Sequence, residues 1–273
     1  MVGGGSHPSD VPEAHHDRAA PILAISELSV RFGGIVALAG VSFEVARGQI
    51  CGLIGPNGAG KTTLFNCLSR LYQPESGAIV FDGTDLLREK RHRIAALGIG
   101  RTFQNLALFR TMSVRQNIMV GGHCRIRGGF VANALRLPLV AREEARLEGA
   151  TRALIDALDL GAVADAPVQA LPFGTRKRVE LARALACDPK LLLLDEPAGG
   201  LNHEEVDRLR ALLLMVRERF KLTVLLVEHH MNFVMSISDK VVALDFGRKI
   251  ADGSPAEVQN APEVIRAYLG AGL

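Results

Sequence analysis

Residues 50–62 read ICGLIGPNGAGKT, and they decide how the rest of the chain is interpreted. The stretch GPNGAGKT at 55–62 matches the pattern G-x-x-x-x-G-K-[ST]. An apolar run precedes it, and KTTLFNCLSRLY at 61–72 carries apolar side chains at helical spacing. The order of strand, glycine-rich loop and helix predicts a phosphate-binding loop more firmly than the pattern alone would.

Each part of this loop suits a nucleoside triphosphate. Glycines let backbone N–H groups curl round a β-phosphate, and a helix N-terminus carries about half a positive charge. We expect Lys61 to neutralise β- and γ-phosphate oxygens during catalysis, and Thr62 to hold Mg²⁺. The alternative, a glycine-rich turn with an incidental lysine, is disfavoured by the flanking pattern. The predicted nucleotide-binding residues here are Gly55, Pro56, Asn57, Gly58, Ala59, Gly60, Lys61, Thr62 and Thr63.

A second chemical signal is the run LLLLDE at residues 191–196. A phosphate-binding loop needs a carboxylate near the metal, at the end of a neighbouring buried strand, and Asp195 supplies one. Adjacent side chains at a strand end point to different sides, which leaves Glu196 able to polarise an attacking water. Such runs are common by themselves, and a solvated acidic turn is the alternative. The roles expected of Asp195 and Glu196 therefore depend on the presence of the phosphate-binding loop in the same sequence.

Composition and patterning set the class of protein. The chain has 273 residues, 48% hydrophobic and 22% charged, which excludes wholesale disorder. A net charge of +3 is too small to indicate nucleic acid as a partner. Four cysteines without a CxxC pair read as reduced thiols of a cytosolic protein. No run approaches the length of a membrane span, and residues 1–20 lack the apolar core of a secretory signal, so we expect a flexible N-terminal extension.

The remaining segments predict an α/β protein with a helical insertion. Runs between 22 and 54 suggest antiparallel strands that lead into one buried strand, and residues 77–86 suggest a hairpin with Asp82-Gly83 as its turn. Residues 101–161 have helical character. Further predictions are buried parallel strands at 190–195 and 222–228, a hairpin at 241–253 and a closing helix at 262–269.

Several motifs, in order, resemble those of the ATP-binding subunits of ABC (ATP-binding cassette) transporters. RTFQN at 101–105 matches the family's Q-loop, LPFGT at 171–175 stands in the place of its signature, and a basic helix is expected from Arg176 to Cys187. GGLN at 199–202 matches the D-loop, and VEHH at 227–230 the switch histidine. The resemblance extends from Phe32 to the C-terminus. It implies a P-loop NTPase ABC-cassette fold with an antiparallel β-subdomain and a helical subdomain.

The resemblance also assigns roles. It implies that ATP and Mg²⁺ bind, that Phe32 stacks on adenine, and that Gln104 and Asp195 complete the metal shell with Thr62. It implies that Glu196 is the catalytic base, that His229 steadies the γ-phosphate, and that Gly174 contacts a partner's nucleotide. The implied boundaries are a core with β-subdomain at about 21–103 and 189–251, a helical subdomain at about 104–188, and a C-terminal segment at 252–273.

Some of these residues have plainer interpretations. Phe32 and His229 could be core residues, and Asn202 could cap a helix as well as contact a second subunit. The usual serine, glycine and glutamine of the signature are replaced by Pro172, Phe173 and Thr175, so only backbone N–H groups remain to meet a γ-phosphate there. We expect weaker phosphate contact, and we treat His230, which stands where the family often has aspartate, as peripheral.

A finer resemblance lies outside the shared motifs, in residues 101–121, 128–150, 231–255 and 260–270. These segments are similar to the longer-insert ATPase subunit of bacterial branched-chain amino-acid importers. The likeness implies permease subunits, a second ATPase subunit and, indirectly, a periplasmic solute-binding protein as partners, and a place on the cytoplasmic face of the inner membrane. Urea or amide importers and lipopolysaccharide export are alternatives. A soluble ATP-driven factor and a non-hydrolysing nucleotide sensor are alternatives of other classes.

Overall fold

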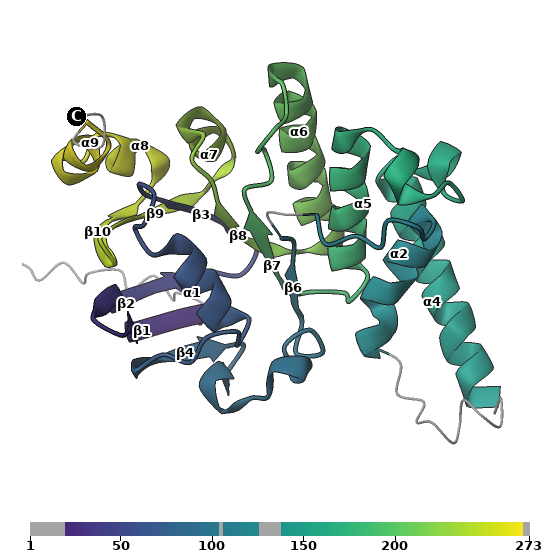
Figure 1. Ribbon diagram of the computed structural model, residues 1–273, viewed down its shortest axis with the longest axis horizontal. Coiled ribbons are helices and arrows are strands. Elements are labelled where there is room, and N and C mark those ends of the chain that lie inside the picture. Colours follow the sequence, from purple (N-terminus) through teal and green to yellow (C-terminus); the bar gives the residue numbers. More distant parts are fainter. Residues whose placement is uncertain (1–19, 104–105, 126–137, 270–273) are drawn as a thin grey trace, which may run out of the picture.

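An antiparallel sheet forms the N-terminal part of the structure, a computed structural model that describes residues 20–103, 106–125 and 138–269. Its strand order is β2-β1-β4-β5 (Figure 1). Asp82 and Gly83, both at positive φ, form the tight turn between β4 and β5, as predicted. The strands are β1 (Leu23–Phe32), β2 (Ile35–Val45), β4 (Ser76–Phe81) and β5 (Thr84–Asp85).

The second sheet has the order β10-β9-β3-β8-β7-β6. All its neighbours pair in parallel except β10, which is antiparallel to β9. The carboxyl ends of the parallel strands therefore meet at one edge of the sheet. The strands are β3 (Ile50–Ile54), β6 (Ile99–Arg101), β7 (Leu191–Asp195), β8 (Thr223–Val227), β9 (Lys240–Asp245) and β10 (Arg248–Gly253).

Successive residues of the parallel strands enter two separate hydrophobic cores. On β7, Leu191 and Leu193 pack with α1 (Lys61–Leu68) and the antiparallel sheet. Leu192 and Leu194 pack with the helices of the opposite face. Because side chains alternate along a strand, a strand covered on both faces reads as one apolar run. This explains why LLLL at 191–194 shows no alternation in sequence.

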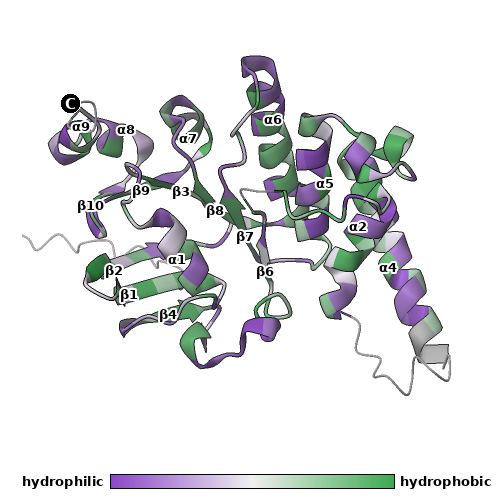
Figure 2. Ribbon diagram, viewed as in Figure 1, coloured by the Kyte–Doolittle hydropathy of each residue, from purple (hydrophilic) through white to green (hydrophobic). Residues whose placement is uncertain are grey.

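Helices cover both faces of the second sheet (Figures 1 and 2). Opposite α1 lie α5 (Phe173–Leu185), α6 (His203–Phe220) and α7 (Met231–Ile237). Next to α5, and packed on it, are α2 (Val114–Gly121) and α4 (Pro138–Ala157). The C-terminal helices are α8 (Pro255–Gln259) and α9 (Pro262–Leu269), and the 3₁₀ turns are η1 (Leu86–Arg88), η2 (Arg91–Arg93), η3 (Gly122–Arg125), η4 (Gly161–Val163) and η5 (Val168–Ala170).

The predicted strands, hairpins, helical insertion and closing helix are confirmed, and two details are wrong. The helix expected from Arg176 begins earlier, at Phe173, because the extended backbone of Pro172 starts the first turn directly. The strand that ends at Asp195 is not next to β3, since β8 lies between β3 and β7. The predicted extension at 1–20 lies outside the described residues, apart from its last position.

Candidate functional site

The loop at 55–60 leaves the carboxyl end of β3 and enters α1. Gly55, Gly58 and Gly60 all have positive φ, at 149°, 82° and 102°. A Cβ atom on Gly60 would lie 2.6 Å from the carbonyl oxygen of Ala37, so both conformation and space require glycine there. The loop therefore curls tightly at the start of α1, with backbone N–H groups at the positive end of a helix.

Lys61 is folded against this loop. Its Nζ donates hydrogen bonds to the carbonyl oxygens of Gly55, at 2.6 Å, and Pro56, at 2.9 Å. Burial lowers the pKa of Lys61, while the charges of Glu196 and Asp195 oppose that shift. Of the predicted metal ligand and its neighbour, Thr62 is exposed and Thr63 half-buried. The cation and the Thr62 hydroxyl thus stand at the first turn of α1, where a phosphate would meet them.

Asp195 ends β7 as a buried side chain, and its main partner was not predicted. Its Oδ2 lies 3.1 Å from Nη2 of Arg101, which ends the adjacent strand β6. Burial raises the pKa of Asp195, and the Arg101 guanidinium opposes that shift. Nη1 of Arg101 also donates to Asn66 Oδ1 and Ser69 Oγ, both at 2.9 Å. Arg101 therefore ties the acid to the far end of α1.

Glu196 has a backbone φ of 49°, which is uncommon outside glycine and requires support from its surroundings. Its N–H donates to the carbonyl oxygen of Val227, and its own carbonyl accepts from Nζ of Lys177 at 3.1 Å. Its Oε1 lies 3.8 Å from Nδ1 of His229. The two acids thus have different neighbours: Asp195 faces Arg101, and Glu196 faces His229.

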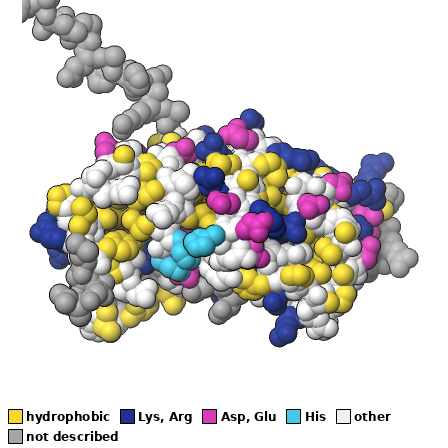
Figure 3. Space-filling view, turned by 90° about the horizontal axis from the view of Figure 1, so that it is seen from above, with side chains coloured by type: hydrophobic (Ala, Val, Ile, Leu, Met, Phe, Trp, Pro, Cys, Tyr) yellow, Lys and Arg dark blue, Asp and Glu magenta, His cyan; other side chains and the backbone are white. Residues whose placement is uncertain are grey.

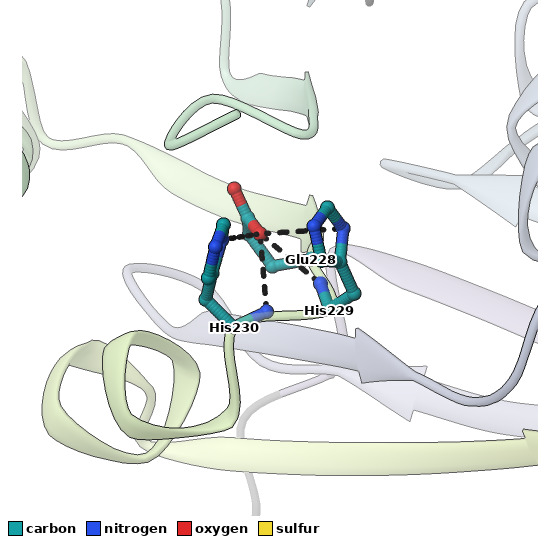
Figure 4. Close-up of side chains that lie close together, drawn as sticks. All are labelled: Glu228, His229 and His230. Carbon is teal, nitrogen blue, oxygen red and sulfur yellow. Dashed lines mark hydrogen bonds and ion pairs between the residues drawn. The ribbon is translucent and has the colours of Figure 1, made fainter. Parts of the chain in front are cut away.

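The segment after β8 is organised by a buried carboxylate, Glu228 (Figure 4). Its Oε1 accepts from the N–H of Ala198 at 2.7 Å, and its Oε2 from the N–H groups of His229 and His230. Nδ1 of His230 lies 3.2 Å from the same Oε2. Both imidazoles are half exposed, so the interpretation of His229 as a core histidine is wrong. Figure 3 shows histidine side chains gathered on the face seen from above.

Ligand atoms of Glu228, His229 and His230 lie within 4.8 Å of one another, the spacing of a possible metal site. Three backbone N–H groups and a ring nitrogen of His230 already engage the Glu228 carboxylate, which is therefore occupied in holding the turn together. This trio is distinct from the predicted Mg²⁺ ligands. We read it as an orienting network for the two histidines.

The signature segment starts α5. Arg176 and Lys177 lie over the Phe173 ring, with the guanidinium carbon 5.7 Å and the Nζ 5.4 Å from its centroid. A Cβ on Gly174 would lie 3.0 Å from Oε1 of Glu205, in the first turn of α6. That turn carries the predicted Asn202 cap, whose side chain accepts from the N–H of Glu205 while the Glu205 carboxylate accepts from that of Asn202.

Gln104 lies outside the described residues, but both sides of it are held by α5. Oε1 of the buried Glu180 accepts from the N–H of Phe103 at 3.0 Å, and Arg183 donates to the carbonyl oxygen of Ala107. Burial raises the pKa of Glu180 and lowers that of Arg183. The segment that contains Gln104 is therefore attached to the same helix that begins with the signature.

Phe32 ends β1 with an exposed ring, so its interpretation as a core residue is wrong. It meets Tyr72 edge to face, with ring centroids 5.0 Å apart. An exposed aromatic pair of this kind offers a face on which a flat base could stack.

Sequence reasoning missed the roles of Arg101, Lys177, Glu180 and Glu228. Two of them carried a signal: Arg101 ends a strand and Glu228 directly follows one, beside the segments that were singled out. A charge at the end of a buried strand needs a partner. Lys177 and Glu180 looked like ordinary residues of a basic helix, and only their position in the fold reveals their contacts.

Comparisons with known proteins identify the family of this chain. A family model described as "ABC transporter" matches residues 38–199, and one described as "Branched-chain amino acid ATP-binding cassette transporter" matches residues 248–273. None of the helices among the described residues combines the length and the hydropathy that a membrane span requires.

Similar proteins include the high-affinity branched-chain amino acid transport ATP-binding protein BraF of Pseudomonas aeruginosa, 42% identical over 92% of this chain and 98% of that protein. LivG of Escherichia coli, which carries the same description, is 38% identical over the same shares. A solved ATP-binding cassette of an ABC transporter in its ADP conformation has a TM-score of 0.80 and 28% identity, over 92% of this chain and all of that one.

Proposed function

The chain belongs to the ABC transporter family of ATP-binding cassettes, and from this premise we propose that it powers the import of branched-chain amino acids. As a member of that family it binds ATP and is the ATP-hydrolysing subunit of a transporter. The observation that carries the cargo is the match of residues 248–273 to the model described as a branched-chain amino acid ATP-binding cassette transporter. Similarity to BraF and LivG over nearly the whole chain supports it.

The ATP-binding residues of the proposal are those of the loop, from Gly55 to Thr63, together with Phe32. The N–H groups of the loop and the Lys61 ammonium would hold the phosphates, which suits a curled backbone and a buried cation. The exposed pair of Phe32 and Tyr72 would receive the adenine.

The donors at the site suit Mg²⁺, a hard cation that prefers oxygen. Thr62 offers a hydroxyl, Asp195 a carboxylate, and Gln104 would add an amide oxygen. When bound, the ion would neutralise charge on the β- and γ-phosphates. Arg101 would keep the Asp195 carboxylate in place, because it contacts one of its oxygens at 3.1 Å.

Glu196 is our proposed catalytic base, and His229 the residue that steadies the γ-phosphate. The 3.8 Å between Oε1 of Glu196 and Nδ1 of His229 allows both to face one water and one phosphate. The left-handed backbone at Glu196, supported by Lys177 and Val227, would keep the carboxylate turned away from Asp195. Glu228 would keep His229 in position by accepting a hydrogen bond from the His229 N–H.

A second cassette would complete each site. Within one chain, the loop residues Pro56 to Ala59 and the signature residues Pro172, Gly174 and Thr175 line different cavities. We propose that this chain pairs head to tail with a second ATPase subunit, either the same chain or a similar one, as in the family, so that the N-terminus of α5 in one meets the nucleotide of the other. Backbone N–H groups near Gly174 would then contact the γ-phosphate in place of the missing serine hydroxyl.

The permease would dock beside the Gln104 segment. Four large apolar side chains in the flanking residues 103–120 are exposed, and exposed apolar patches often mark interaction sites: Phe103, Phe109, Met112 and Val120. Because Glu180 and Arg183 attach this segment to α5, movement of a docked permease would reach the signature helix directly. Such a partner would hold the chain at the cytoplasmic face of the inner membrane, with a periplasmic solute-binding protein on the other side.

Labelled leucine uptake in a strain that lacks this subunit tests the proposal. The wild-type chain should restore uptake and Glu196→Gln should not, because the amide binds ATP but hydrolyses it at least tenfold more slowly, an expectation for loss of a general base. Glu218→Gln, an exposed change of the same kind on α6, is the matched control and should restore uptake.

Two outcomes would contradict it. Intact leucine uptake without the subunit would remove the cargo assignment while leaving the cassette assignment in place. Full hydrolysis by purified Glu196→Gln would remove Glu196 from the role of base.

A further inference from the structure

The closing helix α9 reaches back to the phosphate-binding loop. The N–H of Gly55 donates a hydrogen bond to the Tyr268 hydroxyl at 2.8 Å, across 213 residues of sequence. Figure 1 shows α8 and α9 beside β9 and β10, so the contact brings the last helix of the chain to the end of the central strand β3. The role proposed above for the loop does not use this contact.

Gly55 is the first residue of the loop after β3, and its surroundings leave little conformational freedom. Its φ is 149°, and a Cβ there would lie 2.2 Å from the carbonyl oxygen of Leu244 on β9. At the other end of the loop, the Ala59 carbonyl accepts from the N–H of Gly247 at 3.1 Å. The turn between β9 and β10 therefore supports the loop from one side, and Tyr268 holds its first N–H from α9.

The helix itself is anchored, and it shares a cavity with the loop. The side chain of Val264, on α9, is buried, and this packing anchors the helix. Residues 56–59 of the loop and three residues of α9, Glu263, Arg266 and Ala267, line one cavity of about 600 Å³. The helix and the loop thus border the same cavity, and the Tyr268 hydrogen bond joins α9 to the first residue of the loop.

We propose that Tyr268 is a positioning residue for ATP binding: its hydroxyl fixes Gly55 so that the N–H groups farther along the loop keep the geometry that receives phosphate. The inference rests on the proposed role of residues 55–63 as the ATP-binding loop. It gives the C-terminal segment, which so far only identifies the subgroup, a function in the nucleotide site.

The chemistry of the side chain fits an acceptor role. Burial raises the pKa of Tyr268, and the bond from Gly55 opposes that shift, so the hydroxyl stays neutral across physiological pH. Phenylalanine would keep the ring and its packing but could not accept from the Gly55 N–H. The hydrogen bond can therefore be removed with little change of shape.

The test compares Tyr268→Phe with the wild-type full-length chain. Titration with the non-hydrolysable analogue AMP-PNP should show about fivefold weaker binding, the size expected for loss of one hydrogen bond. In ATP hydrolysis, KM should rise by the same factor while kcat stays within about twofold, because no group that contacts the reacting atoms has changed. The melting temperature should fall by no more than a few degrees, because only the Gly55 N–H loses its acceptor.

Two further variants separate positioning from general support of the helix. Ile265→Ala, at an exposed position of α9, should bind AMP-PNP like the wild type. Tyr268→Leu, which loses ring and hydroxyl, should bind at least as weakly as Tyr268→Phe and melt earlier. Wild-type affinity in Tyr268→Phe, or an equal loss in Ile265→Ala, would overturn the inference alone. Failure of the wild-type chain to bind AMP-PNP would instead overturn the proposed role of the loop, and this inference with it.

Discussion

The helices α1 and α5 begin at two different segments, the glycine-rich loop and the signature, and they begin in different ways. The backbone before α1 curls through three glycines at positive φ, and a buried lysine folds over it. The backbone before α5 is extended at Pro172, whose side chain cannot cap a helix, and an exposed Phe173 follows. Both helices present N–H groups and a positive dipole end, but those of α1 follow a curled loop and those of α5 follow an extended backbone.

The difference indicates how the start of each helix contributes to nucleotide binding. At α1 the loop geometry is fixed internally, by the β9–β10 turn, by Tyr268 and by Lys61. At α5 the contacts of Phe173, Gly174 and Lys177 run to the neighbouring segment 196–205, so the helix end is positioned but not enclosed. We infer that α1 binds nucleotide by itself, whereas α5 acts when another chain supplies the ligand.

Replacing the lysines tests this contrast with the largest expected effect. Burial lowers the pKa of both Lys61 and Lys177, but Lys61 contacts the loop and Lys177 the Glu196 carbonyl. Lys61→Ala should weaken ATP binding about 100-fold, since a charge-assisted contact to phosphate is lost. Lys177→Ala should bind ATP within about threefold of the wild type and lose hydrolysis rate instead, because the turn that holds Glu196 loosens.

Titration of the two purified variants with ATP, followed by turnover measurements, would test whether the two lysines differ in this way. Equal loss of ATP affinity in both would show that the two helix ends are not different in the way inferred.

Replacing the glycines at the two helix starts should have a smaller effect, on stability. Gly60 has positive φ and backbone within 2.6 Å of a new Cβ, so Gly60→Ala should lower the free energy of unfolding by about 2 kcal/mol. At Gly174 the nearest atom is the end of the Glu205 side chain, 3.0 Å away, which can shift. Gly174→Ala should therefore change stability by less than about 1 kcal/mol.

Urea unfolding of both variants measures these differences, with Gly149→Ala, where a new Cβ would meet open space on α4, as a control. A larger loss for Gly174→Ala than for Gly60→Ala would contradict the comparison.

The smallest expected effect is a difference in reactivity between the thiols beside α1 and the thiol beside α5. Labelling these thiols should leave ATP binding unchanged. Burial raises the pKa of Cys51, on β3, to about 12 and that of Cys67, in α1, to about 11. A hydrogen bond from Cys187 lowers the pKa of Cys124, near the end of α5, to about 7. Because the thiolate reacts, iodoacetamide at pH 7.5 should label Cys124 first, at a rate that rises as pH passes 7.

Mass spectrometry of the folded chain, with Cys124→Ser as the control, identifies the labelled site. Comparable labelling of Cys51 would show that the core beside α1 opens as readily as the surroundings of α5.

Much of the site could be predicted because its residues occur in short contiguous segments of the sequence. The loop at 55–62 is contiguous, and the glycine spacing alone requires a curled backbone before a helix. The run at 191–196 likewise shows a buried strand that ends in two acids. Local patterns of this kind depend on backbone conformation and burial, which the sequence encodes directly.

The sequence by itself therefore determined the elements, the glycine-rich loop before α1 and the family. Only the tertiary structure decided the strand order, which puts β8 between β3 and β7, and the partners that hold the site: Arg101 for Asp195, Glu228 for the Ala198 N–H and Tyr268 for Gly55. Arg101 and Tyr268 lie 94 and 213 residues from their partners. The physical reason is that a buried charge or an unpaired N–H must find a partner, but which one it finds depends on how the chain packs.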